Sequence, residues 1–174
     1  MKLAWGLRVS EEFCLRAVEV CYNLGWQDDD RPSYLMSCMA WESGKTFSPS
    51  VKNMAGSGAT GLIQFMPDTA IGQGTTIQQL ERMTAVQQLV EVEKYFRPYR
   101  TKIVTLADMY MAILLPKYIA APPMQILFTD GTKAYRQNSG FDANKDGKIT
   151  KLEATSRVQA LYEMGMMDSF ARNL

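Results

Sequence analysis

Apolar residues recur at three- and four-residue intervals along most of this chain, and this spacing limits the fold to one built from amphipathic helices. The pattern is clearest from Thr76 to Tyr99 and from Leu106 to Leu115, where Pro116 ends it. Capping residues and glycines divide the rest. We therefore expect a mainly α protein with helices from Ser10 up to Gly25, Ser33 to Trp41, Thr76 to Tyr99, Leu106 to Leu115, Gly131 to Asn138 and Lys151 to Asn173.

Length and charge favour one domain over residues 1–174 with no polyanionic partner. The 174 residues are 47% hydrophobic, enough for one well-buried core and too few for two full domains. Nineteen basic and eighteen acidic residues give a net charge of +1, so we expect no nucleic acid partner. No apolar run approaches the roughly 18 to 20 residues needed to cross a bilayer, which predicts no membrane insertion. Charged residues interrupt the N-terminal apolar segment, which predicts no signal peptide.

The chain contains no histidine, and this excludes several catalytic classes. Imidazole is the usual base for serine and cysteine nucleophiles and a frequent ligand of catalytic zinc. Cys14, Cys21 and Cys38 are odd in number, form no C-x-x-C pair and lie within apolar helical patterns. We interpret them as buried free thiols.

The stretch from Trp41 to Met66 joins an apolar helical run to a loop rich in Ser, Thr, Asn and Gly, and Glu42 is its one acid. A carboxylate at a helix C-terminus meets the negative end of the helix dipole, and nearby aromatic residues desolvate it. Both effects raise its pKa, as a general acid near neutral pH requires. The following loop has the composition of a ligand-binding loop, although a plain helix connection is the alternative.

A set of short motifs lies in this stretch and directly after it: Glu42-Ser43, Gly58-Ala59, Gly61-Leu62-Ile63-Gln64, Pro67 and Thr69-Ala70. In these residues the chain resembles the goose-type-lysozyme-like soluble lytic transglycosylases, which include phage endolysins and tail-associated lysins. The resemblance implies a lysozyme-like helical domain that cleaves the MurNAc to GlcNAc β-1,4 bond of peptidoglycan. It also implies that Glu42 is the catalytic acid and base.

The resemblance further implies a substrate-binding set in and beyond the loop. The loop from Glu42 to Gly58 is longer than in many members, which leaves two alternatives for its sugar-binding residue. A tyrosine in the helix ending at Pro116 matches a family tyrosine that contacts the catalytic acid, but Met111 and Ile113 depart from the family pattern there. A core tyrosine bonded elsewhere is the alternative. The expected substrate-binding residues are Ser43, Asn53 or Ser57, Gln64, Phe65 and Tyr110.

The stretch holds no second carboxylate for a two-carboxylate hydrolysis. The next acid, Asp68, is explained by helix capping. The sequence therefore favours a substrate-assisted reaction in which Glu42 is first acid and then base, giving a 1,6-anhydro product. A hydrolytic muramidase on the same fold stays open, and so does a non-catalytic, calcium-stapled wall-binding or virion structural module.

Residues 142–153 fit the template of an EF-hand calcium loop at every required position. Gly147 provides the sharp bend, and we expect one structural Ca²⁺, with an empty acidic turn as the alternative. A second acidic run, Asp28 to Asp30, precedes a proline and is typical of a solvated turn more than of a metal site. The expected calcium ligands are Asp142, Asn144, Asp146, the Lys148 carbonyl and Glu153.

These features together predict the setting in which the protein works. We expect a monomer whose partner is the glycan strand of peptidoglycan. Without a signal peptide, a phage-type protein reaches the wall either by holin-type release from the host cytoplasm or as part of the virion.

Overall fold

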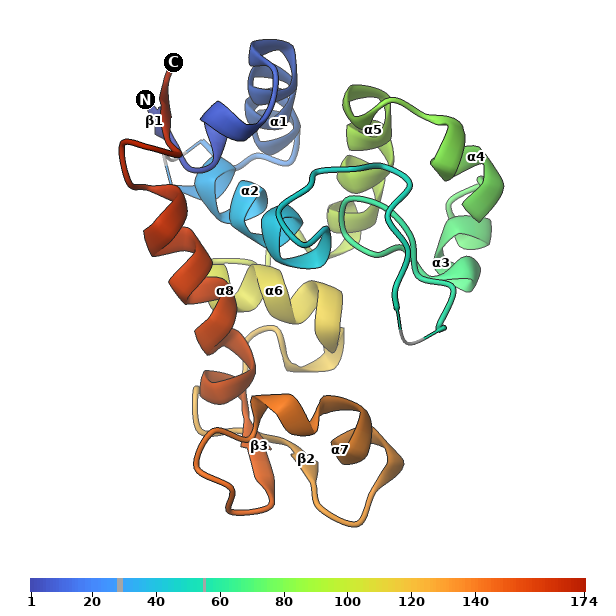
Figure 1. Ribbon diagram of the computed structural model, residues 1–174, viewed down its shortest axis with the longest axis vertical. Coiled ribbons are helices and arrows are strands. Elements are labelled where there is room, and N and C mark those ends of the chain that lie inside the picture. Colours follow the sequence, from blue (N-terminus) through green and yellow to red (C-terminus); the bar gives the residue numbers. More distant parts are fainter. Residues whose placement is uncertain (28–29, 55) are drawn as a thin grey trace.

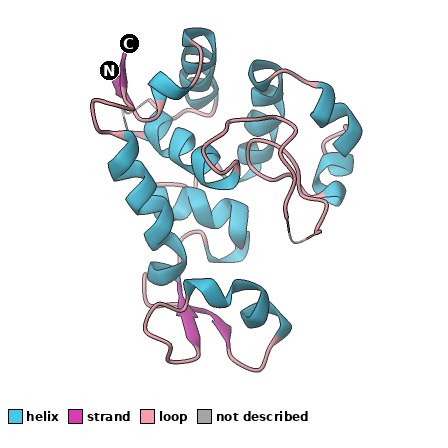
Figure 2. Ribbon diagram, in the orientation of Figure 1, coloured by secondary structure: helices cyan, strands magenta, loops and turns pink. Residues whose placement is uncertain are grey.

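The computed structural model describes residues 1–27, 30–54 and 56–174, and this part of the chain is mainly α (Figures 1 and 2). Two antiparallel pairs of short strands accompany the helices: β1 (Lys2–Leu3) with β4 (Arg172–Asn173), and β2 (Ile126–Thr129) with β3 (Lys148–Thr150). The α-helices are α1 (Glu11–Asn23), α2 (Arg31–Glu42), α3 (Pro67–Gly72), α4 (Ile77–Arg82), α5 (Ala85–Phe96), α6 (Leu106–Leu114), α7 (Lys133–Asn138) and α8 (Lys151–Gly165). Short 3-10 turns are η1 (Gly6–Arg8), η2 (Arg97–Tyr99), η3 (Pro116–Tyr118) and η4 (Ser139–Phe141).

Hydroxyl side chains start most of these helices by accepting a backbone N–H of the first turn. Thr84 forms a capping box with Gln87, and this corrects the prediction of one helix from Thr76 to Tyr99. The chain leaves the helical conformation at Met83, so the region contains α4 and α5 in its place. The other caps are Ser10, Thr76, Thr105, Thr132 and Thr150.

Two further helix boundaries differ from the prediction. Ser33 does not cap α2, which begins after Asp30; its buried hydroxyl accepts the Ala4 N–H at 3.1 Å. The last helix ends at Gly165 and not at Asn173. The indole of Trp5 packs against Gly165, where a Cβ would lie 2.3 Å from Nε1. The chain then turns back, and β4 pairs with β1.

Helix α2 runs through the middle of the fold and is apolar nearly all round (Figure 1). It shares one hydrophobic core with α1, α5, α6 and α8. All three cysteines are buried and free, as the sequence predicts. A helix buried on several faces holds its last residue in a fixed position. Glu42 is the last residue of this buried helix.

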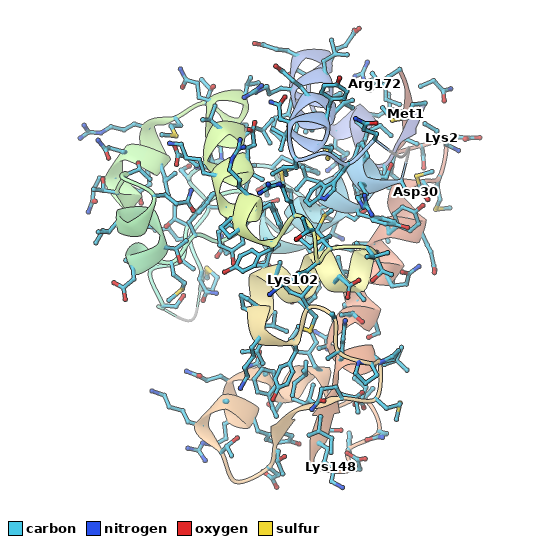
Figure 3. All side chains as sticks on the ribbon, turned by 180° about the vertical axis from the view of Figure 1, so that it is seen from behind. Met1, Lys2, Asp30, Lys102, Lys148 and Arg172 are labelled. Atoms are coloured by element: carbon cyan, nitrogen blue, oxygen red, sulfur yellow. The ribbon has the colours of Figure 1, made fainter. Side chains whose placement is uncertain are left out.

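Two lobes extend from this core. One carries α3, α4 and the long loop before them, and the other carries β2, β3 and α7 (Figure 1). Seen from behind, Lys148 lies at the tip of the second lobe, far from Met1 and Lys2 (Figure 3). In the described residues, no helix has the length and apolar character required to span a membrane. The C-terminal end of α2 leads directly into the long loop before α3 (Figure 1).

Candidate functional site

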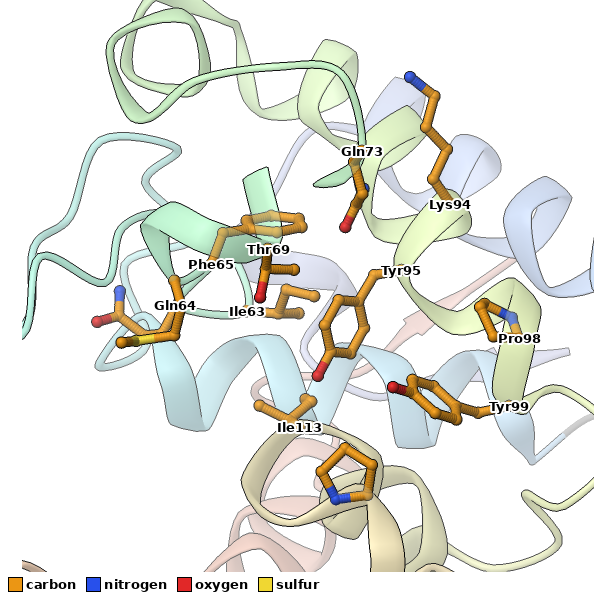
Figure 4. A pocket seen from close by; sticks show the side chains of 12 residues that line it. Ile63, Gln64, Phe65, Thr69, Gln73, Lys94, Tyr95, Pro98, Tyr99 and Ile113 are labelled. Carbon is orange, nitrogen blue, oxygen red and sulfur yellow. The ribbon is translucent and has the colours of Figure 1, made fainter. Parts of the chain in front are cut away.

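An open cavity of about 400 Å³ lies between the segment leading into α3, the end of α5 with η2, and the end of α6 (Figure 4). Tyr95 and Tyr99 line one side, Gln64 and Gln73 the other, and Ile113 the floor. Aromatic faces combined with a few hydrogen-bonding groups are typical of small-ligand sites. The described lining residues include no carboxylate.

Glu42, the last residue of α2, is not among the described residues that line this cavity, but it lies within electrostatic reach of Tyr95, which is. Burial raises the pKa of Glu42 to about 8, so the carboxyl keeps its proton at neutral pH. Within the described residues, its side chain has no hydrogen bond or ion pair. The charge of Glu42, after burial, contributes to raising the pKa of both Tyr95 and Tyr110, which places the carboxyl near both hydroxyls. Glu42 is therefore an unpaired, protonated acid next to the tyrosine side of the cavity.

Ser43 follows Glu42 and organises the turn after the helix. Its buried Oγ accepts the Phe47 N–H at 2.9 Å, and its carbonyl accepts the Thr46 hydroxyl at 2.7 Å. Phe47 adopts a left-handed φ of 52° and enters the core. The Ser43 side chain thus serves the loop itself and lies outside the cavity lining described above.

The backbone at Gly61 and Leu62 is held in place by the side chain of Gln88, a fully buried amide on α5. Gln88 Oε1 accepts the Leu62 N–H at 2.8 Å, and Nε2 donates to the carbonyls of Pro49 at 2.9 Å and Leu80 at 3.1 Å. Gly61 has a φ of 87°, and a Cβ there would lie 2.4 Å from Gln88 Oε1. The sequence analysis missed Gln88, although a polar residue one turn before Val92 on the buried face of α5 is the signal that marks it.

Gln64 and Phe65 both line the cavity, at the end of this loop (Figure 4). Gln64 Nε2 donates to the carbonyls of Val51 and Gly61, both at 3.1 Å, which fixes the amide. The buried ring of Phe65 packs edge-on against Tyr95, with centroids 6.2 Å apart. These two predicted residues therefore meet at the same cavity.

Asn53 and Ser57 lie away from these residues, on the exposed hairpin-like turn between Lys52 and Thr60. The Asn53 N–H donates to the Ala59 carbonyl at 2.9 Å, and Ser57 Oγ accepts the Ala59 N–H at 3.3 Å. Neither residue belongs to the described cavity lining. Asn53 and Ser57 therefore both stay candidates for the sugar-binding residue of this loop.

Tyr110 lies in α6 and is buried against α2. Its hydroxyl accepts a hydrogen bond from Trp41 Nε1 at 2.9 Å. Among the described residues no hydrogen bond joins Tyr110 to Glu42, although the Tyr110 hydroxyl lies within electrostatic reach of that carboxyl. Tyr110 instead holds the indole of Trp41, the residue that precedes the acid.

Gln73 and Lys94 also line the cavity, although the sequence analysis did not identify them, and both are bonded to Glu91. Lys94 Nζ donates to Glu91 Oε1 at 2.8 Å, and Gln73 Nε2 donates to the Glu91 carbonyl at 2.9 Å. Within the described residues, Gln73 Oε1 is buried without a hydrogen-bond partner, and Figure 4 shows it turned toward the cavity. Gln73 therefore offers an acceptor for a ligand N–H or O–H.

Asp68 does not cap α3, because Met66 is the N-cap and no side-chain cap bond forms. Asp68 lies exposed in the first turn of α3, where its charge complements the helix dipole. It gives the cavity no second carboxylate.

The loop at residues 142–153 folds around hydrogen bonds from its own backbone. Asp142 Oδ2 accepts the Tyr135 hydroxyl at 2.6 Å and the Gly147 N–H at 3.0 Å. Asn144 Oδ1 accepts the Asp146 N–H at 3.0 Å, and Asp146 Oδ1 accepts the Lys148 N–H at 2.9 Å. The bend at Gly147 has a φ of 80°, which favours glycine.

The first and last acids of this loop each have a buried oxygen without a partner. Among the described residues, Asp142 Oδ1 and Glu153 Oε1 are buried and accept no hydrogen bond. Glu153 Oε2 is used by the Thr150 N–H at 2.9 Å and hydroxyl at 2.7 Å. The Tyr135 hydroxyl, with backbone N–H groups, lowers the pKa of Asp142 and keeps it charged. Charged and unpaired oxygens fit a hard cation such as Ca²⁺.

These acids are not gathered into a closed cage. Within the described residues, no three His, Cys, Asp or Glu side chains are close enough together to hold a metal ion. In the second acidic run, Asp28 and Asp29 lie outside the described residues, and Asp30 is the N-cap position of α2.

We compared the chain with known protein families, curated proteins and solved structures. No protein-family model, curated protein or solved structure matches this chain.

Proposed function

We propose that this protein is a peptidoglycan-degrading enzyme of lysozyme-like fold that cleaves the MurNAc to GlcNAc β-1,4 bond as a lytic transglycosylase. The observation that carries the proposal is Glu42. It stands at the end of a buried helix with its pKa raised to about 8, beside a cavity lined by tyrosines and amides. A protonated carboxyl with no internal partner is the group that general-acid cleavage of a glycosidic bond requires.

In this mechanism Glu42 acts twice. It first protonates the glycosidic oxygen, while the N-acetyl carbonyl of MurNAc attacks the anomeric carbon and the bond to the leaving GlcNAc breaks. The resulting Glu42 carboxylate then takes the proton of the MurNAc O6 hydroxyl, and O6 closes on the anomeric carbon as the acetamido group leaves. The proton gained in the second step restores the acid, so the cycle balances without water.

The surrounding residues position the sugar for these steps. Tyr95 and Tyr99 offer aromatic surface to a sugar face, while the buried ring of Phe65 packs against Tyr95. Gln64 and Gln73 offer amides to the sugar's hydroxyl and acetamido groups. Glu42 is the one carboxylate in the stretch from Trp41 to Met66, which supports substrate assistance over hydrolysis by two carboxylates. Hydrolysis by a water in place of O6 is the competing outcome, and it is distinguished by its product.

The loop at residues 142–153 would hold a structural Ca²⁺ through Asp142, Asn144, Asp146, the Lys148 carbonyl and Glu153. The cation would supply positive charge to the two unpaired buried oxygens and hold the second lobe together. It takes no part in bond cleavage in this proposal. The resemblance to phage lysins further supports a role in wall lysis, with holin-type release or virion association as the two routes. Detection of the polypeptide in purified virions would favour the second route.

The test compares wild type with Glu42→Gln on purified peptidoglycan. Glutamine keeps the shape of the side chain but carries no transferable proton, so clearing of a turbid wall suspension is expected to fall by about 10² to 10⁴-fold. Glu12→Gln, an exposed carboxylate on α1, is the matched control and is expected to act like wild type. Circular dichroism checks that each variant is folded.

Mass spectrometry of the released muropeptides identifies the reaction. Anhydromuropeptides support the transglycosylase. Reducing MurNAc ends that incorporate solvent oxygen would show a hydrolytic muramidase. Absence of any cleavage by folded wild type would favour the non-catalytic wall-binding module.

A further inference from the structure

Arg157, on the exposed face of α8, lies over two aromatic rings next to Glu42. Its guanidinium carbon is 6.0 Å from the centroid of the Trp41 ring and 5.4 Å from that of Phe141. The two rings are tilted against each other with centroids 6.2 Å apart. Residues from α2, η4 and α8 therefore build one cluster, which joins the second lobe to the end of α2.

The charge of Arg157 is not used inside the protein. Its guanidinium donates to the Gly140 carbonyl, and among the described residues no carboxylate lies within ion-pair distance of it. Lys151 on the same helix provides the contrast, because it is buried and donates to Asp108 Oδ1 at 2.7 Å. Stacking on aromatic rings holds a guanidinium in place and leaves its other N–H groups facing solvent. Arg157 is therefore a fixed cation with free donors.

This cation lies over the ring of Trp41, and Trp41 immediately precedes the candidate acid Glu42 in α2. The Tyr110 hydroxyl accepts a hydrogen bond from Trp41. Burial raises the pKa of Tyr110 most; the charge of Glu42 raises it further, and the charge of Arg157 lowers it, so both groups lie within electrostatic reach of this hydroxyl. Because Glu42 is neutral below about pH 8, it does not neutralise Arg157. An anionic ligand bound near Glu42 would meet a positive charge that no protein group compensates.

We propose that Arg157, Trp41 and Phe141 form a subsite for a carboxylate-bearing sugar unit adjacent to the bond that Glu42 cleaves. This inference rests on the proposed function and names the substrate feature that the site selects. The guanidinium binds a carboxylate in a fork of two hydrogen bonds, and the exposed ring edges contact the sugar. The carboxylate is either the free lactyl group of MurNAc or a carboxylate of an attached peptide stem.

The experiment measures binding by calorimetry in the Glu42→Gln background, so that no substrate is consumed. Glu42→Gln is compared with Glu42→Gln/Arg157→Gln, because glutamine keeps a donor for the Gly140 carbonyl while it removes the charge. The probes are uncharged chitotetraose, a peptide-free MurNAc-GlcNAc tetrasaccharide, and the same tetrasaccharide carrying stem peptides. Glu42→Gln/Arg82→Gln, which removes an exposed cation on α4, is the control.

Arg157→Gln is expected to weaken binding of at least one carboxylate-bearing probe by roughly tenfold or more, since a hydrogen-bonded charge pair is worth about 1.5 to 3 kcal/mol. Chitotetraose binding and the control are expected to stay unchanged. Loss for the peptide-free probe alone identifies the lactyl carboxylate, and loss for the peptide-bearing probe alone identifies the stem. Equal loss for all three probes, or no loss for any, would overturn the subsite.

Failure of the proposed function gives a different result. If wild type binds these glycans but cleaves none, the catalytic proposal fails while the charge preference is still measured. If no glycan binds at all, both proposals fail. Arg157→Lys adds a separate readout, because a lysine keeps the charge without the planar fork and is expected to restore affinity only in part.

Discussion

Glu42 and Asp142 both have carboxyl oxygens without a hydrogen-bond partner among the described residues, and their pKa values are shifted in opposite directions. At the end of α2, burial raises the pKa of Glu42 to about 8, and the carboxyl keeps a proton. In the second lobe, the Tyr135 hydroxyl and backbone N–H groups lower the pKa of Asp142, and the carboxylate keeps its charge while Oδ1 stays unpaired. A held proton suits an acid catalyst, and a held charge suits a metal ligand.

The surroundings of the two acids differ in the same sense. The loop after Glu42 is completed by the protein itself, through the buried amide of Gln88 and the hydroxyl of Ser43. The loop after Asp142 is held by local hydrogen bonds within the second lobe. Among the described residues, Asp142 Oδ1 and Glu153 Oε1 in this loop are buried without a hydrogen-bond partner. We therefore expect the stability of the region around Glu42 to depend on pH and on the hydrogen bonds that hold its loop. We expect the stability of the region around Asp142 to depend on calcium.

The largest effect is expected from pH. The pKa of Glu42 is 4.5 in an ordinary environment and about 8 in the fold, so the native state binds the proton more tightly than the unfolded state. The stabilising contribution of this proton is complete below pH 4.5 and is lost as pH rises to 8. The loss is roughly 1.4 kcal/mol for each pH unit, on the order of 4 kcal/mol across the window.

Chemical denaturation of wild type and Glu42→Gln between pH 4.5 and 8.5 measures this. Glutamine does not titrate, so the variant is expected to lose less stability with rising pH, and the difference between the two curves isolates the proton. Wild-type lysis should fall as pH passes about 8, because the acid form disappears. Parallel denaturation curves for the two proteins would show that Glu42 has an ordinary pKa.

The next largest effect is expected from Gln88, whose side chain holds the loop after Glu42. Gln88→Leu removes the partners of the buried Leu62 N–H and of the Pro49 carbonyl and leaves both groups unpaired, whereas the Leu80 carbonyl keeps the Met83 N–H at 3.2 Å. We expect a loss of roughly 3 kcal/mol or more in the free energy of unfolding, with calcium binding unchanged. Gln78→Leu, an exposed change on α4, is the control. A loss below about 1 kcal/mol would mean that the loop is held by something other than this amide.

Calcium is expected to act on the second region alone. A cation bound only by the native state adds about 2.7 kcal/mol at a hundredfold excess over Kd, which raises the melting temperature. Glu153→Gln removes the twelfth-position carboxylate and is expected to erase most of the shift, whereas Glu163→Gln on the same helix should keep it. Melting in EGTA and in calcium measures this. Equal melting temperatures in both buffers for wild type would show that the loop binds no calcium.

Local signals account for the parts of the structure that the sequence predicted. The mainly α fold, the end of α2 at Glu42 and the buried thiols follow from spacing and capping residues near each position. The division between α4 and α5 was missed although its capping box, Thr84 to Gln87, is present in the sequence. Strong apolar periodicity on both sides masked it.

Contacts between distant segments account for what the sequence did not predict. Gln88 completes a loop on another segment, and Arg157 stacks on rings from α2 and η4. Tyr110 was expected to face Glu42 but bonds Trp41, because its partner depends on how α6 is rotated against α2. Spacing along one helix does not fix that rotation.

The smallest effects are expected from two tyrosine hydroxyls, one in each region. Tyr110→Phe leaves the Trp41 N–H without its acceptor and should lower the free energy of unfolding by about 1 kcal/mol. Because the hydroxyl does not bond Glu42 in this structure, lysis should fall less than tenfold, and calcium affinity should not change. A loss of lysis comparable to that of Glu42→Gln would mean that the Tyr110 hydroxyl contacts the reacting atoms.

Tyr135→Phe is the counterpart in the second region. It removes the strongest influence that lowers the pKa of Asp142, so that pKa should rise toward its ordinary value. Calcium binding should weaken, more at pH 5 than at pH 7, because protonation of Asp142 then competes with the cation. Lysis at saturating calcium should match wild type. Calcium titrations of both tyrosine variants at the two pH values measure this, and a weaker calcium affinity in Tyr110→Phe than in Tyr135→Phe would contradict the separation of the two regions.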